Sequence, residues 1–253
     1  MKVDLGGKTA LVTGASSGLG WHFAQSLARS GATVIAAARR AEKVNELVTA
    51  LSAEGFKGYS LALDVTDVSS IRNCIAEAAD KTGGLDILVN NAGIAVAKPA
   101  LECDQGDWDS VIDTNLSGAW YVAQAVARSM AEKNRGGSII NIASILGMRV
   151  ANHLPAYVAA KAGLIHLTKA LALEWSRYQI RVNALAPGYI LTEINREFFA
   201  TELGQATIMR IPQRRIGKPE DLDGALLLLA SDASSFMTGS VITVDGGHAV
   251  NSL

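Results

Sequence analysis

The sequence predicts an α/β protein with a doubly wound Rossmann fold, in which helices cover both faces of a seven-stranded, mostly parallel sheet. Short apolar runs rich in β-branched residues alternate with longer helical patterns along the chain, which is typical of right-handed βαβ units. Several of the short runs are continuously apolar, as expected for strands that are covered on both faces. A glycine-rich turn joins the first strand to the first helix, as in other folds of this class.

Seven short apolar runs predict the strands, and the helical patterns between them predict the helices. We expect strands at residues 8–13, 32–38, 59–63, 86–90, 138–143, 180–186 and 241–244. We expect helices at residues 18–30, 41–54, 68–81, 107–134, 155–177 and 220–231, with a further helical segment within residues 193–209. Because no proline- or serine-rich linker and no repeat divides the sequence, we expect residues 1–253 to form a single domain.

The composition is that of a compact globular protein. Hydrophobic residues make up 49% of the chain and charged residues 19%, which is enough apolar material for a large core. The formal net charge of −1 gives no basic field, which argues against general nucleic-acid binding. No apolar run approaches the roughly 18 residues of a membrane span, and the start MKVDLGGK lacks the apolar core of a secretion signal. We therefore expect a cytoplasmic protein that binds neither nucleic acid nor membrane.

A glycine-rich turn, TGASSGLG at residues 13–20, follows the first predicted strand and leads into a helix. A strand that turns sharply into a helix presents free backbone N–H groups and the positive end of the helix dipole, which together suit a pyrophosphate. The spacing departs from the G-x-G-x-x-G fingerprint, and the turn lacks the Gly-Lys-Ser/Thr ending of an ATP-binding loop. The glycines alone would also fit an ordinary turn between a strand and a helix.

Further motifs follow the turn in order along most of the chain: Asp64-Val65, Asn90-Asn91-Ala92-Gly93, Asn115, Ser144, Tyr157-Val158-Ala159-Ala160-Lys161, Pro187-Gly188 and Thr192. Together with the T-G-x-x-x-G-x-G turn, this set resembles the short-chain dehydrogenase/reductase family, a single-domain Rossmann-fold group of about this length. The resemblance implies an NAD(P)(H)-dependent oxidoreductase that interconverts a ketone and a secondary alcohol by hydride transfer. It also implies that residues 188–215 form the loop and helical segment that holds the substrate.

The resemblance assigns cofactor contacts along the whole chain. Asp64 and Val65 are expected to hold the adenine, Asn91 to support the cofactor, and the stretch from Pro187 to Thr192 to flank the nicotinamide. Taken alone, Asp64 would fit a carboxylate that caps a turn. The full set of expected contacts is Gly14, Ser16, Ser17, Gly18, Leu19, Gly20, Arg39, Asp64, Val65, Asn91, Ala92, Gly93, Tyr157, Lys161, Pro187, Gly188, Ile190 and Thr192.

Tyr157 and Lys161 lie four residues apart in a helical pattern, so their side chains rise from the same face of the helix. Because a nearby ammonium lowers the pKa of a phenol from about 10 by about 1 to 3 units, Tyr157 is expected to exchange a proton with the substrate oxygen. Ser144, at the end of the fifth strand, would hydrogen-bond the same oxygen. By resemblance, Asn115 completes a catalytic tetrad, and its backbone carbonyl would hold a water against Lys161.

The end of the second strand indicates which cofactor is preferred. NAD-specific proteins of such folds place an acidic side chain there, which binds the adenosine ribose hydroxyls. Ala38 occupies this position, and Arg39 after it can pair with a 2′-phosphate through its fork of donors. We therefore expect NADP(H) as the preferred cofactor and NAD(H) as the alternative. Ser17 stands where some NADP-dependent members of the family carry a second basic residue, and Arg39 and Arg40 would also fit solvated residues that open a helix.

The expected substrate segments, residues 145–154 and 189–199, are mostly apolar but include Arg149, His153 and Asn195. The substrate is therefore a hydrophobic ketone, a β-keto ester or a sugar acid. A 3-oxoacyl thioester on an acyl carrier protein is a further alternative, since such family members present two arginines to the carrier. Arg128 falls near the first of them, whereas leucine replaces the second at position 173. A non-catalytic dinucleotide sensor or scaffold is the alternative of another class.

No metal site is expected in this sequence. Neither His153 nor His166 has a companion ligand at the spacing that zinc requires. Cys74 and Cys103 are expected as free thiols, because two isolated cysteines suit neither a disulfide framework nor a zinc cluster.

Self-association is expected from two helices, and the resemblance implies a homotetramer. The helices predicted at 107–134 and 155–177 carry apolar residues on more faces than a sheet would cover, including Trp120, Tyr121 and Trp175. Closed two-fold packing between subunits would cover these residues.

Overall fold

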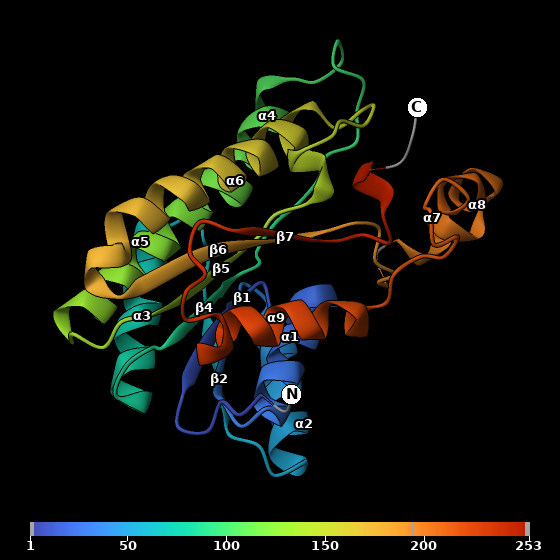
Figure 1. Cartoon of the computed structure of the whole chain (residues 1–253). Coiled ribbons are helices and arrows are strands. Elements are labelled where there is room, and N and C mark those ends of the chain that lie inside the picture. Colours follow the sequence, from blue (N-terminus) through green and yellow to red (C-terminus); the bar gives the residue numbers. More distant parts are fainter. Residues whose placement is uncertain (1–2, 194, 251–253) are drawn as a thin grey trace.

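The computed structural model, which describes residues 3–193 and 195–250, contains one seven-stranded sheet with helices on both faces (Figure 1). The strand order is β3-β2-β1-β4-β5-β6-β7, and every pairing is parallel. The chain builds outward from β1 to β3 and then returns to β1's other side to build from β4 to β7. This reversal opens a crevice beyond the carboxyl ends of β1 and β4, where such folds bind ligands. The expected Rossmann fold is confirmed.

The elements follow the predicted order closely. The strands are β1 (Thr9–Thr13), β2 (Thr33–Ala38), β3 (Gly58–Ala62), β4 (Ile87–Asn90), β5 (Gly137–Ile142), β6 (Ile180–Pro187) and β7 (Val241–Val244). The helices are α1 (Gly18–Arg29), α2 (Ala41–Ala53), α3 (Val68–Thr82), α4 (Gln105–Ile112), α5 (Ala119–Glu132), α6 (Pro155–Trp175), α7 (Arg196–Ala200), α8 (Glu202–Ile208) and α9 (Asp223–Ala230).

Two apolar layers sandwich the sheet, because successive side chains of a strand point to opposite faces. On one face, β1 and β2 pack against α1, α2 and α9, with Phe23 and Leu47 fully buried. On the other face, the alternate residues of the same strands pack against α3, α5 and α6, with Val122 and Val126 fully buried. The strands are therefore covered on both sides, and their carboxyl ends are left to form the site (Figure 1).

The single helix expected at residues 107–134 is wrong in one respect. The structure divides it into α4 and α5 with a π-helical turn, Asp113–Gly118, between them. Gly118 lies so close to the loop after β3 that an added Cβ would be 2.8 Å from the backbone oxygen of Val65. The wider turn carries a buried Asn115, and π-turns of this kind are frequent at functional sites.

The helical segment expected within residues 193–209 consists of two short helices, α7 and α8, and residue 194 lies outside the described residues. Thr201 separates the two helices, since its hydroxyl accepts a hydrogen bond of 3.1 Å from the N–H of Gly204. The pair stands beyond the carboxyl end of β6, close to the C-terminal turn at His248–Val250 (Figure 1). In the described part of the chain, no helix is long and apolar enough to cross a membrane.

Candidate active site

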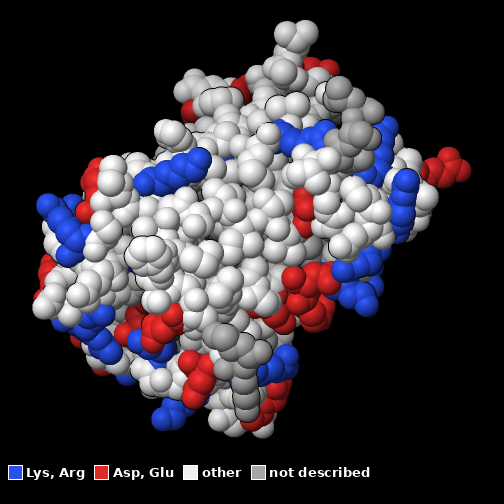
Figure 2. All heavy atoms as spheres, viewed as in Figure 1, with Lys and Arg blue, Asp and Glu red and all other residues white. Residues whose placement is uncertain are grey.

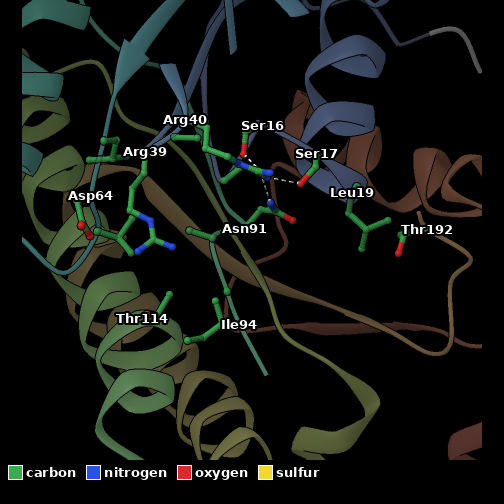
Figure 3. Close-up of a pocket in the computed structure, with 17 residues that line it drawn as sticks. Ser16, Ser17, Leu19, Arg39, Arg40, Asp64, Asn91, Ile94, Thr114 and Thr192 are labelled. Carbon is green, nitrogen blue, oxygen red and sulfur yellow. Dashed lines mark hydrogen bonds between the residues drawn. The ribbon is translucent and has the colours of Figure 1, made fainter. Parts of the chain in front are cut away.

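A cavity of about 570 Å³ lies at the carboxyl ends of β1, β2, β3 and β4 (Figure 3). Most of the residues expected to contact the cofactor line this cavity. They are Gly14, Ser16, Ser17, Gly18, Leu19, Arg39, Asp64, Val65, Asn91, Ala92, Gly93 and Thr192. Segments that are far apart in the sequence are thus brought together because parallel strands end at the same edge of the sheet.

The glycine-rich turn after β1 depends on glycine at two positions. Gly14 has a φ of +66°, and an added Cβ would lie only 2.9 Å from Cα of Ala92. A Cβ on Gly20 would overlap the backbone oxygen of Gly14, so the first turn of α1 can approach β1 closely only without a side chain there. The result is a narrow backbone cradle at the start of α1, whose free N–H groups and dipole suit a pyrophosphate.

Asn91 ties this turn to the end of β4. Its Nδ2 donates a hydrogen bond of 2.9 Å to the backbone oxygen of Thr13. In return, Oγ1 of Thr13 accepts hydrogen bonds of 2.9 Å from the backbone N–H groups of Asn91 and Ala92. The two strand ends therefore hold each other at a fixed separation, which sets the width of the cavity between them.

Asp64 closes the cavity on the β3 side. Its carboxylate accepts hydrogen bonds from the N–H and the hydroxyl of Thr66, at 3.0 and 2.7 Å. These bonds, aided by the nearby charge of Arg39, hold the pKa of Asp64 below its usual value. The carboxylate is therefore anionic and already engaged with its own turn, which agrees with Asp64 as a turn cap. Its expected contact with the adenine stays a prediction.

Five cavity residues were not among the expected cofactor contacts: Ala38, Arg40, Leu63, Ile94 and Thr114. All five adjoin residues that were expected in the site: Ala38 and Arg40 flank Arg39, Leu63 precedes Asp64, Ile94 follows Gly93 and Thr114 precedes Asn115. A sequence signal therefore existed, because neighbours of a site residue on a loop commonly face the same space. Nothing in the sequence indicated which of the two adjacent arginines would reach the glycine-rich turn.

Three residues expected to act in catalysis meet at the carboxyl end of β5. Ser144 follows that strand, and its Oγ accepts a hydrogen bond of 3.1 Å from the N–H of Leu146. Tyr157 and Lys161 lie one turn apart on α6, with Nζ of Lys161 5.6 Å from the centre of the Tyr157 ring. A Cβ on Gly93, which lines the cavity, would be 3.7 Å from Nζ of Lys161. The lysine thus lies at the boundary between this cluster and the cavity.

The fourth member of the expected tetrad, Asn115, is completely buried in the π-helical turn. Its Nδ2 donates to the backbone oxygen of Ile94, and its Oδ1 accepts from the N–H of the same residue, both at 2.8 Å. The side chain therefore holds the loop after β4. A Cβ on Gly93 would be 3.3 Å from Oδ1 of Asn115 and 3.7 Å from Nζ of Lys161, so both side chains lie against the loop after β4.

The pKa of Tyr157 is shifted upward in this structure, whereas the spacing predicted that Lys161 would lower it. Burial raises the pKa of the Tyr157 phenol, and a hydrogen bond with Ser144 opposes that rise only in part. Burial also lowers the pKa of Lys161 from 10.5 to about 8. The ammonium donates instead to the backbone oxygen of Ile142 at 2.7 Å. Burial away from water therefore has the largest effect on the pKa of both Tyr157 and Lys161.

Residues 187–192, which were expected beside the nicotinamide, do not all line the same cavity. Gly188 donates its N–H to the backbone oxygen of Val244 at 2.9 Å, which continues the β6–β7 pairing beyond Pro187. Ile190 is buried in the core, bridges to Gly217 and lines a second cavity of about 360 Å³. Of this stretch, only Thr192 lines the larger cavity. Its N–H donates to Oδ1 of Asn195 at 2.8 Å.

The polar residues expected in the substrate segments are mostly occupied by other contacts. Asn195 uses Oδ1 for Thr192 and Nδ2 for the backbone oxygen of Ile190, at 2.8 Å each. Nη1 of Arg149 donates to the backbone oxygen of His248 at 2.7 Å, which joins the loop after Ser144 to the C-terminal turn. His153 is exposed. The described residues contain no group of three His, Cys, Asp or Glu side chains that could hold a metal ion.

Comparison with known proteins agrees with this geometry. Residues 14–249 match a family model described as enoyl-(acyl carrier protein) reductase, adh_short_C2. Gluconate 5-dehydrogenase of Gluconobacter oxydans is 40% identical over 249 residues, with 98% of this chain and 97% of the relative covered. The chain belongs to the short-chain dehydrogenase/reductase family. As a member of this family, it is an NAD(P)(H)-dependent oxidoreductase that interconverts ketones and alcohols.

Other members of the short-chain dehydrogenase/reductase family differ in substrate. The 3-oxoacyl-[acyl-carrier-protein] reductase of Thermotoga maritima is 42% identical over 248 residues, with coverage of 97% of this chain and 99% of the relative. A solved gluconate 5-dehydrogenase from Burkholderia cenocepacia, in complex with NADP and tartrate, has a TM-score of 0.95 and 37% identity. That alignment covers 99% of this chain and 98% of the solved one. The family is thus shared, while the substrate varies at similar identity.

Proposed function

We propose that this chain is an NADP(H)-dependent dehydrogenase/reductase that acts on the ketone or secondary alcohol of a small sugar acid. The observation that carries the proposal is the position of Lys161, whose Nζ would lie 3.7 Å from a Cβ on the cavity residue Gly93 and 5.6 Å from the ring centre of Tyr157. A proton-transfer group thus borders the space into which the strands open. A sensor or scaffold would have no need of Ser144, Tyr157 and Lys161 in one place.

The reaction needs a proton at the substrate oxygen, and Tyr157 is suited to supply it. In the direction of reduction, the phenol donates a proton to the carbonyl oxygen while Ser144 hydrogen-bonds the same oxygen and stabilises the charge that develops there. In the direction of oxidation, Tyr157 takes the proton back. The charge of Lys161 is proposed to oppose the rise that burial causes in the pKa of Tyr157. Asn115 is proposed to connect Lys161 to solvent through its backbone oxygen.

The cavity fits a nicotinamide dinucleotide, which supplies the hydride when it is bound. The glycine cradle at Gly14 is proposed to hold the pyrophosphate, and Asp64 with Val65 the adenine. A preference for NADP(H) follows from the carboxyl end of β2, where Ala38 offers no carboxylate and two arginines line the cavity. The solved Burkholderia relative contains NADP. At equal concentration, we expect turnover with NADPH to exceed turnover with NADH.

The sugar-acid substrate is proposed from the relatives named above and from the polar residues beside the site. Arg149 and His248 join the loop after Ser144 to the C-terminal turn, so the wall of the substrate region is not wholly apolar. The second candidate is a 3-oxoacyl thioester on a carrier protein, which the identity to the Thermotoga reductase favours. Against it, Leu173 is 81% exposed where a second arginine is expected for carrier binding.

The test is a panel of purified substrates with each cofactor, followed by the absorbance of the reduced nicotinamide. Gluconate with NADP⁺, a 5-keto acid with NADPH, and an acetoacetyl thioester with NADPH separate the two candidates. Turnover of the acids alone supports the proposal, whereas turnover of the thioester alone would overturn the substrate assignment. No turnover of any carbonyl or alcohol, with tight cofactor binding, would favour the sensor.

We also propose that the chain assembles as a homotetramer with two-fold symmetry. Such an assembly needs two separate self-complementary surfaces. One is offered by α5 and α6, where Trp120 and Trp175 stack at 6.2 Å beside a cavity of about 640 Å³ lined by Leu167 and Ala170. The other is the open edge of the sheet at β7. Figure 2 shows few charged side chains in the middle of the face seen in Figure 1 and most of them around its rim.

The cytoplasm is proposed as the location of the enzyme. Cys74 and Cys103 are free, and Cys74 is buried, which raises its pKa to about 12. Unpaired cysteines suit a reducing compartment. Fractionation of the cells that make this protein tests the assignment.

A further inference from the structure

The second arginine after β2, Arg40, lies against the glycine-rich turn. Its Nη2 donates hydrogen bonds of 2.9 Å to Oγ of Ser16 and to Oγ of Ser17 (Figure 3). Arg39 takes a different direction, toward the side of the cavity that holds Asp64 (Figure 3). Two consecutive arginines therefore deliver their charges to two different places in one cavity.

The two charges also differ in how far they are compensated. Arg39 acts electrostatically on the Asp64 carboxylate, whose pKa it helps to lower. Arg40 contacts only neutral hydroxyls, and within residues 3–193 and 195–250 it takes part in no ion pair. Both of its hydrogen bonds come from Nη2, so the donors on Nη1 and Nε remain for an anion. Arg40 thus presents an uncompensated charge at the turn.

The guanidinium of Arg40 brings a positive charge to the glycine-rich turn. Ser17 has no charge, and the side chain of Arg40 reaches it from the end of another strand. A guanidinium that is fixed by two hydroxyls loses little further freedom when it pairs with a phosphate, and its planar fork matches phosphate oxygens. Serine at position 17 and arginine at position 40 together provide what a single basic residue in the turn would provide.

We propose that Arg40, held by Ser16 and Ser17, is the residue that distinguishes NADP(H) from NAD(H) by binding the 2′-phosphate. The inference rests on the proposed function, which supplies the cofactor, and it adds Arg40 to Arg39, the residue that the sequence indicates. Arg39 then serves chiefly the Asp64 side of the cavity. A positioning role for Arg40 in the turn would instead affect NADP(H) and NAD(H) equally, because the turn faces the pyrophosphate that both share.

The experiment measures binding and does not depend on turnover. NADPH and NADH are each titrated by calorimetry into the wild-type chain, Arg40→Gln, Arg39→Gln and the control Arg29→Gln. Arg29 is an exposed arginine on α1 whose nearest ion-pair partner is Glu54 at 3.2 Å, so its loss removes the same charge far from the turn. We expect Arg40→Gln to raise the Kd for NADPH by at least about tenfold, equivalent to about 1.4 kcal/mol, and the Kd for NADH by less than about twofold. Arg39→Gln should change the NADPH:NADH ratio less than Arg40→Gln does.

A second variant removes the positive charge at position 40 and supplies one at position 17, so that the charge stays at the same place in the cavity. Arg40→Gln combined with Ser17→Arg should restore NADPH affinity to within about threefold of the wild type. Equal weakening of NADPH and NADH by Arg40→Gln, an unchanged ratio, or failure of this rescue would overturn the proposal. Because each readout is binding, a wild-type chain that turns over no substrate would contradict the proposed function and leave this result intact.

Discussion

Nζ of Lys161 donates a hydrogen bond of 2.7 Å to the backbone oxygen of Ile142, the last residue of β5. The lysine is only 4% exposed, and burial lowers its pKa from 10.5 to about 8. The unfolded chain keeps the ordinary pKa and therefore binds more protons between these two pH values. The cost of the buried charge is complete below pH 8 and is relieved as the pH rises toward 10.5.

Replacement of Lys161 by methionine should remove this cost while keeping the apolar stem. We expect Lys161→Met to have a larger free energy of unfolding than the wild type at about pH 7, by about 1 to 3 kcal/mol after the lost hydrogen bond is counted. The difference should shrink as the pH is raised to about 10. Urea unfolding of both proteins at the two pH values measures it. A difference that does not change with pH would show that the lysine is not charged at a cost in the folded protein.

The glycine cradle gives a prediction with a matched control. Gly14 and Gly55 both have a positive φ, of +66° and +86°, but an added Cβ meets Cα of Ala92 at 2.9 Å only at Gly14. Gly55→Ala should therefore cost only the backbone term, about 1 kcal/mol, and leave NADPH binding unchanged. Gly14→Ala should cost about 1 to 3 kcal/mol more and abolish tight NADPH binding. Thermal unfolding measures the stability of both variants, and titration measures their affinity for NADPH. Equal losses of stability and affinity in the two variants would argue against a cradle at Gly14.

Asn115 is predicted to hold the loop after β4 through its two bonds to Ile94. Asn115→Ala would leave the part-buried N–H and carbonyl of Ile94 without these partners, at up to about 1 to 3 kcal/mol each. We expect a loss of about 2 to 5 kcal/mol in the free energy of unfolding, against less than about 0.5 kcal/mol for Asn73→Ala on the exposed side of α3. Similar losses in both variants, measured by urea unfolding, would mean that the bonds to Ile94 contribute little.

The proposed tetramer predicts which surface substitution dissociates it. Ala170 is exposed on α6 and lines the cavity against α5, so Ala170→Glu would bury a charge in the subunit contact. Ala53, exposed at the end of α2, provides the same substitution outside that surface. Sedimentation should give a tetramer of 26.5 kDa subunits for the wild type and Ala53→Glu, and smaller species for Ala170→Glu. A wild-type monomer at micromolar concentration would contradict the assembly.

The sequence predicted the sheet and the clustering of motifs because both depend on local patterns. Apolar runs place the strands, and the parallel order brings Gly14, Asp64 and Asn91 to one edge without any further information. The π-helical turn at Asp113–Gly118 was not predicted. Its last residue, Gly118, lies close to Val65, and such a contact between distant segments leaves no local pattern in the sequence. Helical periodicity continues across the turn and conceals it.

The electrostatics of the site could not be predicted from spacing. The four-residue separation of Tyr157 and Lys161 correctly placed both side chains on one face of α6. Their pKa values depend instead on how deeply the surrounding chain buries them, which only the packed structure determines. The direction of an arginine side chain likewise depends on its hydrogen-bond partners in the folded structure. Arg40 points toward the glycine-rich turn, where it donates to Ser16 and Ser17.

The most direct test of the account is the turnover of Tyr157→Phe, because this substitution keeps the ring and removes the only proton that Tyr157 can give. Wild type and variant are compared with NADPH and whichever ketone the wild type reduces, alongside NADPH binding by titration. The account predicts that kcat falls by about 100-fold or more while the Kd for NADPH stays within about twofold. A variant that retains most of its kcat with unchanged NADPH binding would contradict the assignment of Tyr157 as the proton donor.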